Sequence, residues 1–137
     1  MSAATISSSD VTYTTASIPW TVSWNDVFTS SAPYSLTISG DNGVGTVYSI
    51  TSSTPTSGTV NVTGLTPGVS YVFTITATAY YAVLGESITD IETTSFTTLA
   101  NVKYWDGSSW VSKSMKVWDG SNWIEKPVKV WNGSSWV

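Results

Sequence analysis

The sequence predicts an all-β protein in two parts, a sandwich of about seven strands over residues 1–99 and short hairpins over residues 102–137. Large apolar side chains alternate with Ser and Thr along the first part, which is the period of a strand with one buried face. Turn residues interrupt this alternation about every ten residues, as in sandwiches. No stretch has helical periodicity. The length of 137 residues leaves room for one ordinary domain and an appendage.

The strands follow from the alternation in chain order. We expect them near residues 6–13, 18–24, 34–38, 48–50, 60–62, 71–79 and 88–99. Asp41-Asn42-Gly43 supplies turn chemistry between the third and fourth strands, which therefore form a hairpin. Four large aromatic residues occupy alternating strand positions and are expected in the core: Trp20, Trp24, Tyr71 and Phe73.

One motif resembles a known family. Residues 65–71, Leu-Thr-Pro-Gly-Val-Ser-Tyr, and the alternating strand to Ala79 resemble the corner and following strand of fibronectin type III domains. In that family the Tyr closes a tyrosine corner and the Leu fills the core. Trp24 is placed like the family's core Trp, and Gly85-Glu86-Ser87 resembles the end of a loop near its last strand. The resemblance covers residues 1–99 and implies an immunoglobulin-like fibronectin type III sandwich; no Arg-Gly-Asp occurs, so integrin binding is not implied.

The second part is an internal repeat with a period of thirteen residues. Three units align without gaps: VKYWDGSSWVSKS (102–114), MKVWDGSNWIEKP (115–127) and the truncated VKVWNGSSWV (128–137). Each carries Asp-Gly or Asn-Gly between two tryptophans, which is the strongest short signal for a hairpin. We therefore expect one hairpin per unit. A two-residue loop would pair Trp105 with Ser108, and a four-residue loop would pair Trp105 with Trp110; both put the two indoles on one face.

The repeat tryptophans have two interpretations. In the first, they pack into a buried aromatic cluster. In the second, they form an exposed platform whose indoles stack on sugar rings, while a neighbouring Lys binds an acidic group of the ligand. We favour packing, because six exposed indoles would make a larger apolar patch than soluble monomers usually leave bare. The two interpretations merge if other subunits cover the patch. The candidate residues for binding or assembly are Trp105, Trp110, Trp118, Trp123, Trp131, Trp136, Lys103, Lys116 and Lys129.

The hairpins are short, and we expect them to be ordered by packing on one another, on another copy or on a larger particle. A symmetric homo-oligomer would bury the indoles together and separate the three repeated lysines, so we favour it. A second contact candidate is the apolar segment at Tyr80, Tyr81 and Leu84, which is expected in a loop between two strands.

Composition excludes most chemistry. The chain has no Cys, His or Arg, and its carboxylates show no catalytic spacing, so we expect no enzyme activity, cofactor or metal. Before residue 101 there are six acidic residues and no Lys; five Lys and three acids follow. This balance disfavours nucleic acid. No apolar run is long enough for a membrane span, and the first residues do not form a secretion signal.

The repeats also carry a resemblance. WNGSSWV-type repeats behind immunoglobulin-like domains resemble accessory segments of tailed-bacteriophage virion proteins, especially minor tail and decoration proteins. This implies a non-enzymatic virion protein, on head or tail, assembled in the host cytoplasm, with virion proteins, itself and a host surface glycan as expected partners. One part would anchor to the particle, and the other would be displayed or hold copies together. The alternative is an extracellular glycan-binding module of a secreted bacterial protein that uses the tryptophan repeats.

Overall fold

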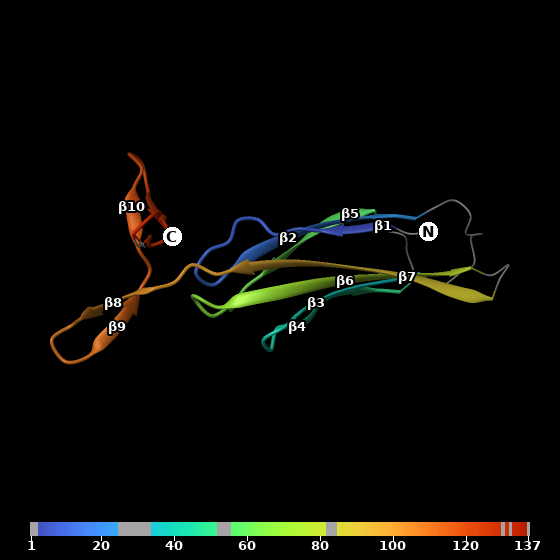
Figure 1. The fold of residues 1–137 in the computed structure, drawn as a ribbon, viewed down its shortest axis with the longest axis horizontal. Helices are drawn as coiled ribbons and strands as arrows, with labels where there is room; N and C mark the ends of the chain where they lie inside the picture. Colours follow the sequence, from blue (N-terminus) through green and yellow to red (C-terminus); the bar gives the residue numbers. More distant parts are fainter. Residues whose placement is uncertain are drawn as a thin grey trace.

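The molecule is a β-sandwich with small hairpins at one end (Figure 1). The computed structural model describes residues 3–24, 34–51, 56–81, 85–129, 131 and 133–136. All regular elements within these ranges are strands, which confirms the all-β fold class. No helix that could span a membrane occurs in the described ranges.

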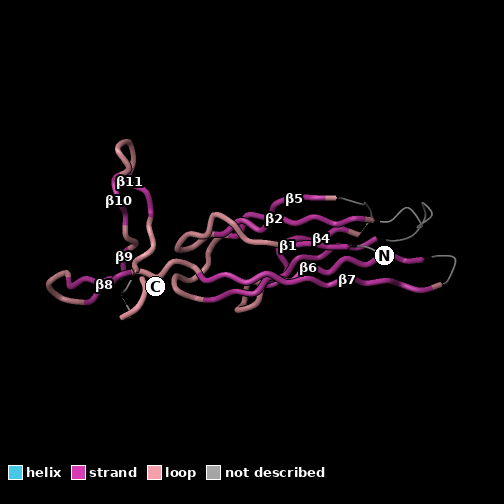
Figure 2. Tube along the Cα trace, turned by 45° about the horizontal axis from the view of Figure 1, so that its top comes forward, coloured by secondary structure: helices cyan, strands magenta, loops and turns pink. Residues whose placement is uncertain are grey.

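Seven strands form two antiparallel sheets that face each other (Figure 2). In spatial order, the first sheet contains β1 (Ala3–Ile6), β2 (Ala16–Ser23) and β5 (Ser57–Val62). The second contains β4 (Gly45–Ile50), β3 (Tyr34–Gly40), β6 (Ser70–Tyr81) and β7 (Glu86–Thr97). The hairpin expected around Asp41-Asn42-Gly43 is present as β3 and β4.

The first strand lies earlier than the alternation predicted. β1 ends at Ile6, whereas the strand was expected over residues 6–13. The chain then turns at Thr12, whose Oγ1 accepts hydrogen bonds from the N–H groups of Thr14 (3.2 Å) and Thr15 (3.0 Å). A hydroxyl that bonds to nearby backbone in this way competes with strand pairing. This turn brings Tyr13 to the end of the sandwich where the hairpins begin.

The core lies between the two sheets. Alternating residues of both sheets point inward, as a period of two requires. The largest fully buried side chains are Ile18, Val22, Leu36, Ile38, Phe73 and Ile75. Phe96 of β7 stacks on Phe73, with ring centroids 5.7 Å apart.

Trp20, not Trp24, is the buried tryptophan of the core. Trp20 is 4% exposed, and its cross-strand partner is Gly58 on β5. A Cβ at Gly58 would stand 2.7 Å from Cζ2 of the Trp20 indole, so the indole needs a glycine there. Trp24 follows the last residue of β2, is half-buried, and packs edge-on against Tyr34 with centroids 5.1 Å apart. Both tryptophans were expected in the core; Trp24 packs against it from just beyond the end of β2 and is therefore less buried than Trp20.

The tyrosine corner is present. The phenol oxygen of Tyr71 accepts a hydrogen bond from the Thr66 N–H at 2.9 Å, and Leu65 is buried. Thr98 closes the same corner from the end of β7, because its hydroxyl donates to Thr66 O at 2.6 Å and accepts from Val69 N–H at 3.1 Å. These bonds fix the end of the sandwich from which the repeats depart.

The two sheets are linked along one side by β1 and β7. The Ala4 N–H donates to Oδ2 of Asp90 at 2.6 Å. A carboxylate of the second sheet therefore accepts a hydrogen bond from a backbone N–H at the edge of the first sheet. On the opposite side, between β4 and β5, the sandwich leaves a groove of about 470 Å³.

Candidate functional site

The first hairpin holds two indoles side by side. β8 (Val102–Trp105) pairs with β9 (Trp110–Lys113), and Trp105 stands opposite Trp110. This is the four-residue loop of the two registers considered. The indole centroids are 5.9 Å apart and the rings are inclined by 63°, an edge-to-face arrangement that aromatic pairs prefer.

The turn of this hairpin is held by its own side chains. Oδ1 of Asp106 accepts hydrogen bonds from the N–H groups of Ser108 and Ser109, each at 2.8 Å, and from the Ser108 hydroxyl at 2.9 Å. The bond from the Ser108 N–H, followed by that from Ser109, lowers the pKa of the Asp106 carboxyl from 3.8 to about 2. Gly107 supplies the positive φ of +106° that the loop requires.

The second hairpin repeats this geometry. β10 (Lys116–Trp118) pairs with β11 (Trp123–Glu125), and the Trp118 and Trp123 centroids are 5.7 Å apart at 58°. Oδ1 of Asp119 accepts from the N–H groups of Ser121 and Asn122, each at 2.8 Å. The bond from Asn122, then that from Ser121, lowers the pKa of Asp119.

The third unit repeats the indole pair. Trp131 and Trp136 form an isolated antiparallel bridge, with centroids 5.6 Å apart at 58°. Gly133 has a positive φ of +100°, close to the value of Gly107. Asn132, which takes the place of the turn aspartate in the sequence, lies outside the described residues.

The six repeat indoles are open to solvent. Their exposed fractions lie between 51% for Trp118 and 66% for Trp110, whereas Trp20 in the core is 4% exposed. The first two hairpins form separate two-stranded sheets and the third unit an isolated bridge, and no strand of one unit pairs with a strand of another among the described residues. In this single chain the indoles therefore form an exposed surface and not a buried cluster.

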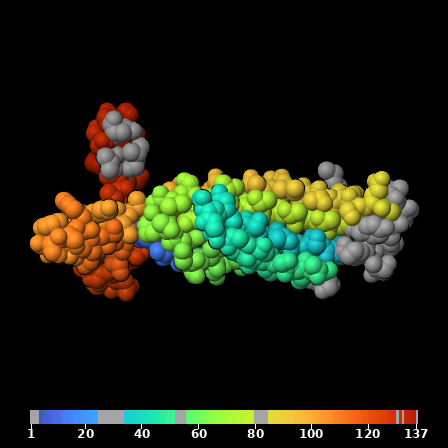
Figure 3. All heavy atoms as spheres, turned by 90° about the horizontal axis from the view of Figure 1, so that it is seen from below, coloured from blue at the N-terminus to red at the C-terminus, as the bar shows by residue number. Residues whose placement is uncertain are grey.

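The hairpins point in different directions. The first continues roughly along the long axis of the sandwich, whereas the second turns away from it (Figures 1 and 2). The space-filling view shows the last residues as a further lobe (Figure 3). The six indoles are thus divided into pairs, and the single large apolar patch assumed from the sequence is not formed.

The first two indole pairs each share their face with one lysine, and the third pair has a lysine at the same sequence spacing. Lys103 and Lys116 precede Trp105 and Trp118 by two residues along a strand, so each lies on the face of the indoles. Lys129 precedes Trp131 by the same spacing. We call each pair with its lysine a tryptophan face: Trp105, Trp110 and Lys103; Trp118, Trp123 and Lys116; Trp131, Trp136 and Lys129.

The other two lysines of the repeats have different surroundings. Nζ of Lys113 lies 5.2 Å from the centre of the Tyr104 ring, a cation–π distance. Lys126 is close enough to Asp119 to contribute to the lowering of its pKa. The structure gives no such contact for Lys103, Lys116 or Lys129 within the described ranges.

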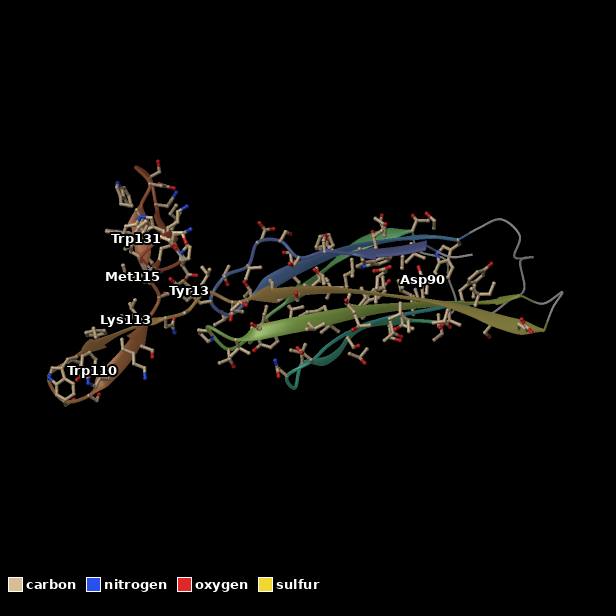
Figure 4. The ribbon with its side chains drawn as sticks, in the orientation of Figure 1. Tyr13, Asp90, Trp110, Lys113, Met115 and Trp131 are labelled. Atoms are coloured by element: carbon tan, nitrogen blue, oxygen red, sulfur yellow. The ribbon has the colours of Figure 1, made fainter. Side chains whose placement is uncertain are left out.

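The hairpins are joined to the sandwich by Tyr13, which sequence reasoning missed. Its phenol oxygen accepts from the Met115 N–H at 2.8 Å and donates to Lys126 O at 2.7 Å, at the base of the second hairpin (Figure 4). Tyr13 is 3% exposed. It lies in the connection between β1 and β2, where no periodic signal marks it.

The second contact candidate is placed differently from the prediction. Tyr80 and Tyr81 are not in a loop, because β6 continues through Tyr81 and pairs these residues with Ser87 and Glu86 of β7. Backbone pairing with β7 therefore extends the strand beyond Ala79, where the apolar alternation ends. Leu84 lies outside the described residues.

The rest of the described surface offers few groups that could bind a ligand or a metal. Among the residues that the structure describes, no three Asp or Glu side chains gather in a way that would hold a metal ion. The groove between β4 and β5, unforeseen from the sequence, is lined by uncharged side chains, among them Val44, Val60, Asn61 and Thr66. The tryptophan faces are therefore the strongest candidate site.

Sandwich topology, tyrosine corner and buried tryptophan define an immunoglobulin-like module. The chain belongs to the fibronectin type III family, whose model matches residues 2–94. Domains of this family are typically non-catalytic structural or binding modules, which is the broad class of this protein.

Solved structures similar to the chain include two of the sensor domain of the anti-sigma factor RsgI4 from Pseudobacteroides cellulosolvens. A short form is 24% identical, covers 72% of this chain and 95% of its own, and has a TM-score of 0.50. A solution structure is 25% identical, covers 95% and 93%, and has a TM-score of 0.46. The first likeness supports the sandwich fold. No curated protein matches the chain.

Proposed function

We propose that the chain is a non-enzymatic accessory protein of a tailed-bacteriophage virion, located on the head or the tail. The proposal rests on the resemblance of its WDGSSW-type repeats, behind an immunoglobulin-like domain, to accessory segments of such virion proteins. The broad class of non-catalytic structural or binding module agrees with it.

One structural observation carries the proposal. The repeats that carry the three indole pairs lie at one end of an elongated sandwich, and the long strands β6 and β7 lead away to the other end (Figure 1). A molecule with two chemically different ends can attach to a particle by one end and present the other. The sandwich contains acidic residues without any Lys or Arg, whereas all five Lys are in the repeats.

Fractionation of phage particles tests the proposal. Particles purified from a lysate of the host by density gradient should contain the chain in a fixed ratio to the major capsid protein, measured by quantitative mass spectrometry. The ratio should survive repeated banding. If the chain remains in the soluble fraction and is absent from banded particles, it is not a virion protein.

The second candidate is a glycan-binding module of a secreted bacterial protein. The exposure of all six repeat indoles favours it, because flat apolar ring faces stack on sugar rings. The same fractionation separates the two candidates. A secreted module would appear in the medium of uninfected bacterial cultures, where no particles are present.

A further inference from the structure

We propose that the three tryptophan faces bind a carboxylate-bearing polysaccharide of the host cell surface. Sugar rings would lie on the indole pairs, and Lys103, Lys116 and Lys129 would contact the carboxylates. This inference rests on the proposed function and makes the hairpins the displayed end of the molecule and the sandwich the attached end.

The indole pairs are held in the open by local structure. Asp106 satisfies the two serine N–H groups of its own turn, and Asp119 does the same in the second hairpin. The loop geometry therefore does not depend on a cover from elsewhere in the chain. Three hairpins keep the same indole geometry, with centroids 5.6–5.9 Å apart and angles of 58–63°.

The size of each tryptophan face suits a small repeating ligand better than a protein. Two indoles that are half to two-thirds exposed offer roughly 300 Å², since a whole aromatic side chain offers up to about 250 Å². A stable protein interface needs about 800 Å² on each partner. Because the hairpins point in different directions, the three faces do not add up to one such interface. A few sugar rings would cover one face.

The charges on the faces select an anionic ligand. The lysines of the faces lack contacts in the described part of the chain, whereas Lys113 lies over Tyr104 and Lys126 lies near Asp119. On the second face, Glu125 is the cross-strand partner of Lys116, although no ion pair between them is formed. This face should therefore be the weakest of the three for a carboxylate ligand.

Repetition explains why three weak sites are useful. An exposed ion pair contributes little binding free energy, and one indole pair contacts only a few sugar-ring atoms. A polymer that presents the same acidic sugar many times can occupy several faces of one chain, so the later contacts are intramolecular. The thirteen-residue repeat is then matched to a repeating ligand.

The binding test uses the full chain and two polymers with the same sugar ring. Polygalacturonate carries a carboxylate on every ring, and its methyl ester carries none. Tryptophan fluorescence titration should show tighter binding of polygalacturonate, and rising salt should remove most of this difference. Equal binding of both polymers, or binding of neither, would overturn the proposal, while the particle fractionation would still decide the proposed function.

Matched lysine variants locate the contact. K103Q/K116Q and K113Q/K126Q remove the same net charge from exposed positions. We expect the first pair to weaken polygalacturonate binding about fourfold, a factor of about two for each exposed ion pair, and the second to leave it unchanged. Equal losses in both would mean that only the overall charge matters, and would overturn the assignment to the faces.

Two further measurements test the role of the charge beside Lys116 and the oligomeric state of the chain. Glu125→Gln should strengthen binding of polygalacturonate and leave binding of the methyl ester unchanged, because it removes an acid beside Lys116. Sedimentation of the same samples without polymer should show a monomer. A homo-oligomer in which the six indoles resist quenching by acrylamide would show that a second copy of the chain occupies the faces instead.

Discussion

The phenol oxygen of Tyr13 lies 2.8 Å from the backbone nitrogen of Met115, which follows it by 102 residues in the chain. The same oxygen donates to Lys126 O, so one side chain of the sandwich holds both strands of the second hairpin at their base. The hairpins are therefore not free appendages. The two hydrogen bonds of the Tyr13 hydroxyl give the second tryptophan face a defined position relative to the sandwich.

Replacing Tyr13 by Phe should loosen the second hairpin and leave the sandwich folded. Phenylalanine keeps the ring and removes the hydroxyl, so Met115 N–H loses its partner, at a cost of about 1 kcal/mol. Amide hydrogen exchange should accelerate at Met115 and remain unchanged in β6. Tyr104→Phe, on the exposed surface of the first hairpin, is the control. Unchanged protection of the Met115 amide would show that the Tyr13 hydroxyl does not stabilise the second hairpin.

Replacing Gly58 by Ala should destabilise the sandwich. The added methyl group would meet the Trp20 indole at 2.7 Å, and overpacking of this kind costs about 1–3 kcal/mol. Chemical denaturation should show an earlier midpoint. In a Trp20→Phe background the smaller ring leaves room, so the loss caused by Gly58→Ala should shrink. If the two substitutions lower the free energy of unfolding additively, the methyl group added at Gly58 does not clash with the indole of Trp20.

Acid should loosen the first two turns and spare the third. Folding lowers the pKa of the Asp106 carboxyl from 3.8 to about 2. The ionised carboxylate therefore stabilises the turn fully above about pH 4, and this stabilisation is lost as the pH falls through 2. The pKa of Asp119 is lowered as well. The amide shifts of Ser108 and Ser121 should report this titration by NMR. The third unit has Asn132 at this sequence position, so Ser134 should not change; a matching change there would contradict the assignment.

Residues 1–99 should fold without the repeats. The buried core and the tyrosine corner lie within this range, and Leu99 still bonds to Thr12 and Gly68. A chain that ends at Leu99 should give the circular dichroism and cooperative melting of a β-sandwich. Tyr71→Ala in this chain should cost about 3–5 kcal/mol, the range for large buried aromatic residues. A disordered spectrum, with the full chain folded, would show that the repeats belong to the core.

The sandwich could be predicted because its signals are local. The motif from Leu65 to Tyr71 identifies the tyrosine corner, and the structure confirms the bond that closes it. The shared alternation of Trp20 and Trp24 predicted both in the core, but it could not show that β2 ends at Ser23 and leaves Trp24 only half-buried. β6 likewise continues past Ala79, because the backbone of Tyr80 and Tyr81 still pairs with Ser87 and Glu86 of β7.

The candidate site could be predicted only in part. The repeat identified the six indoles and the three lysines, but Asp-Gly allowed two loop lengths. The four-residue loop forms because Asp106 bonds to the N–H groups of both Ser108 and Ser109, which must then lie inside the turn. The directions of the hairpins depend on long-range contacts such as that of Tyr13, and no local pattern encodes such contacts.

Oxidative footprinting of the indoles on purified particles tests the central claim, that the tryptophan faces are a displayed ligand-binding surface. Brief hydroxyl-radical exposure followed by mass spectrometry gives the oxidation rate of each repeat tryptophan. We predict that the six react on the particle as fast as in the free chain, and that polygalacturonate protects them while its methyl ester protects them less. Indoles already protected on the particle, or unaffected by the polymer, would contradict the claim.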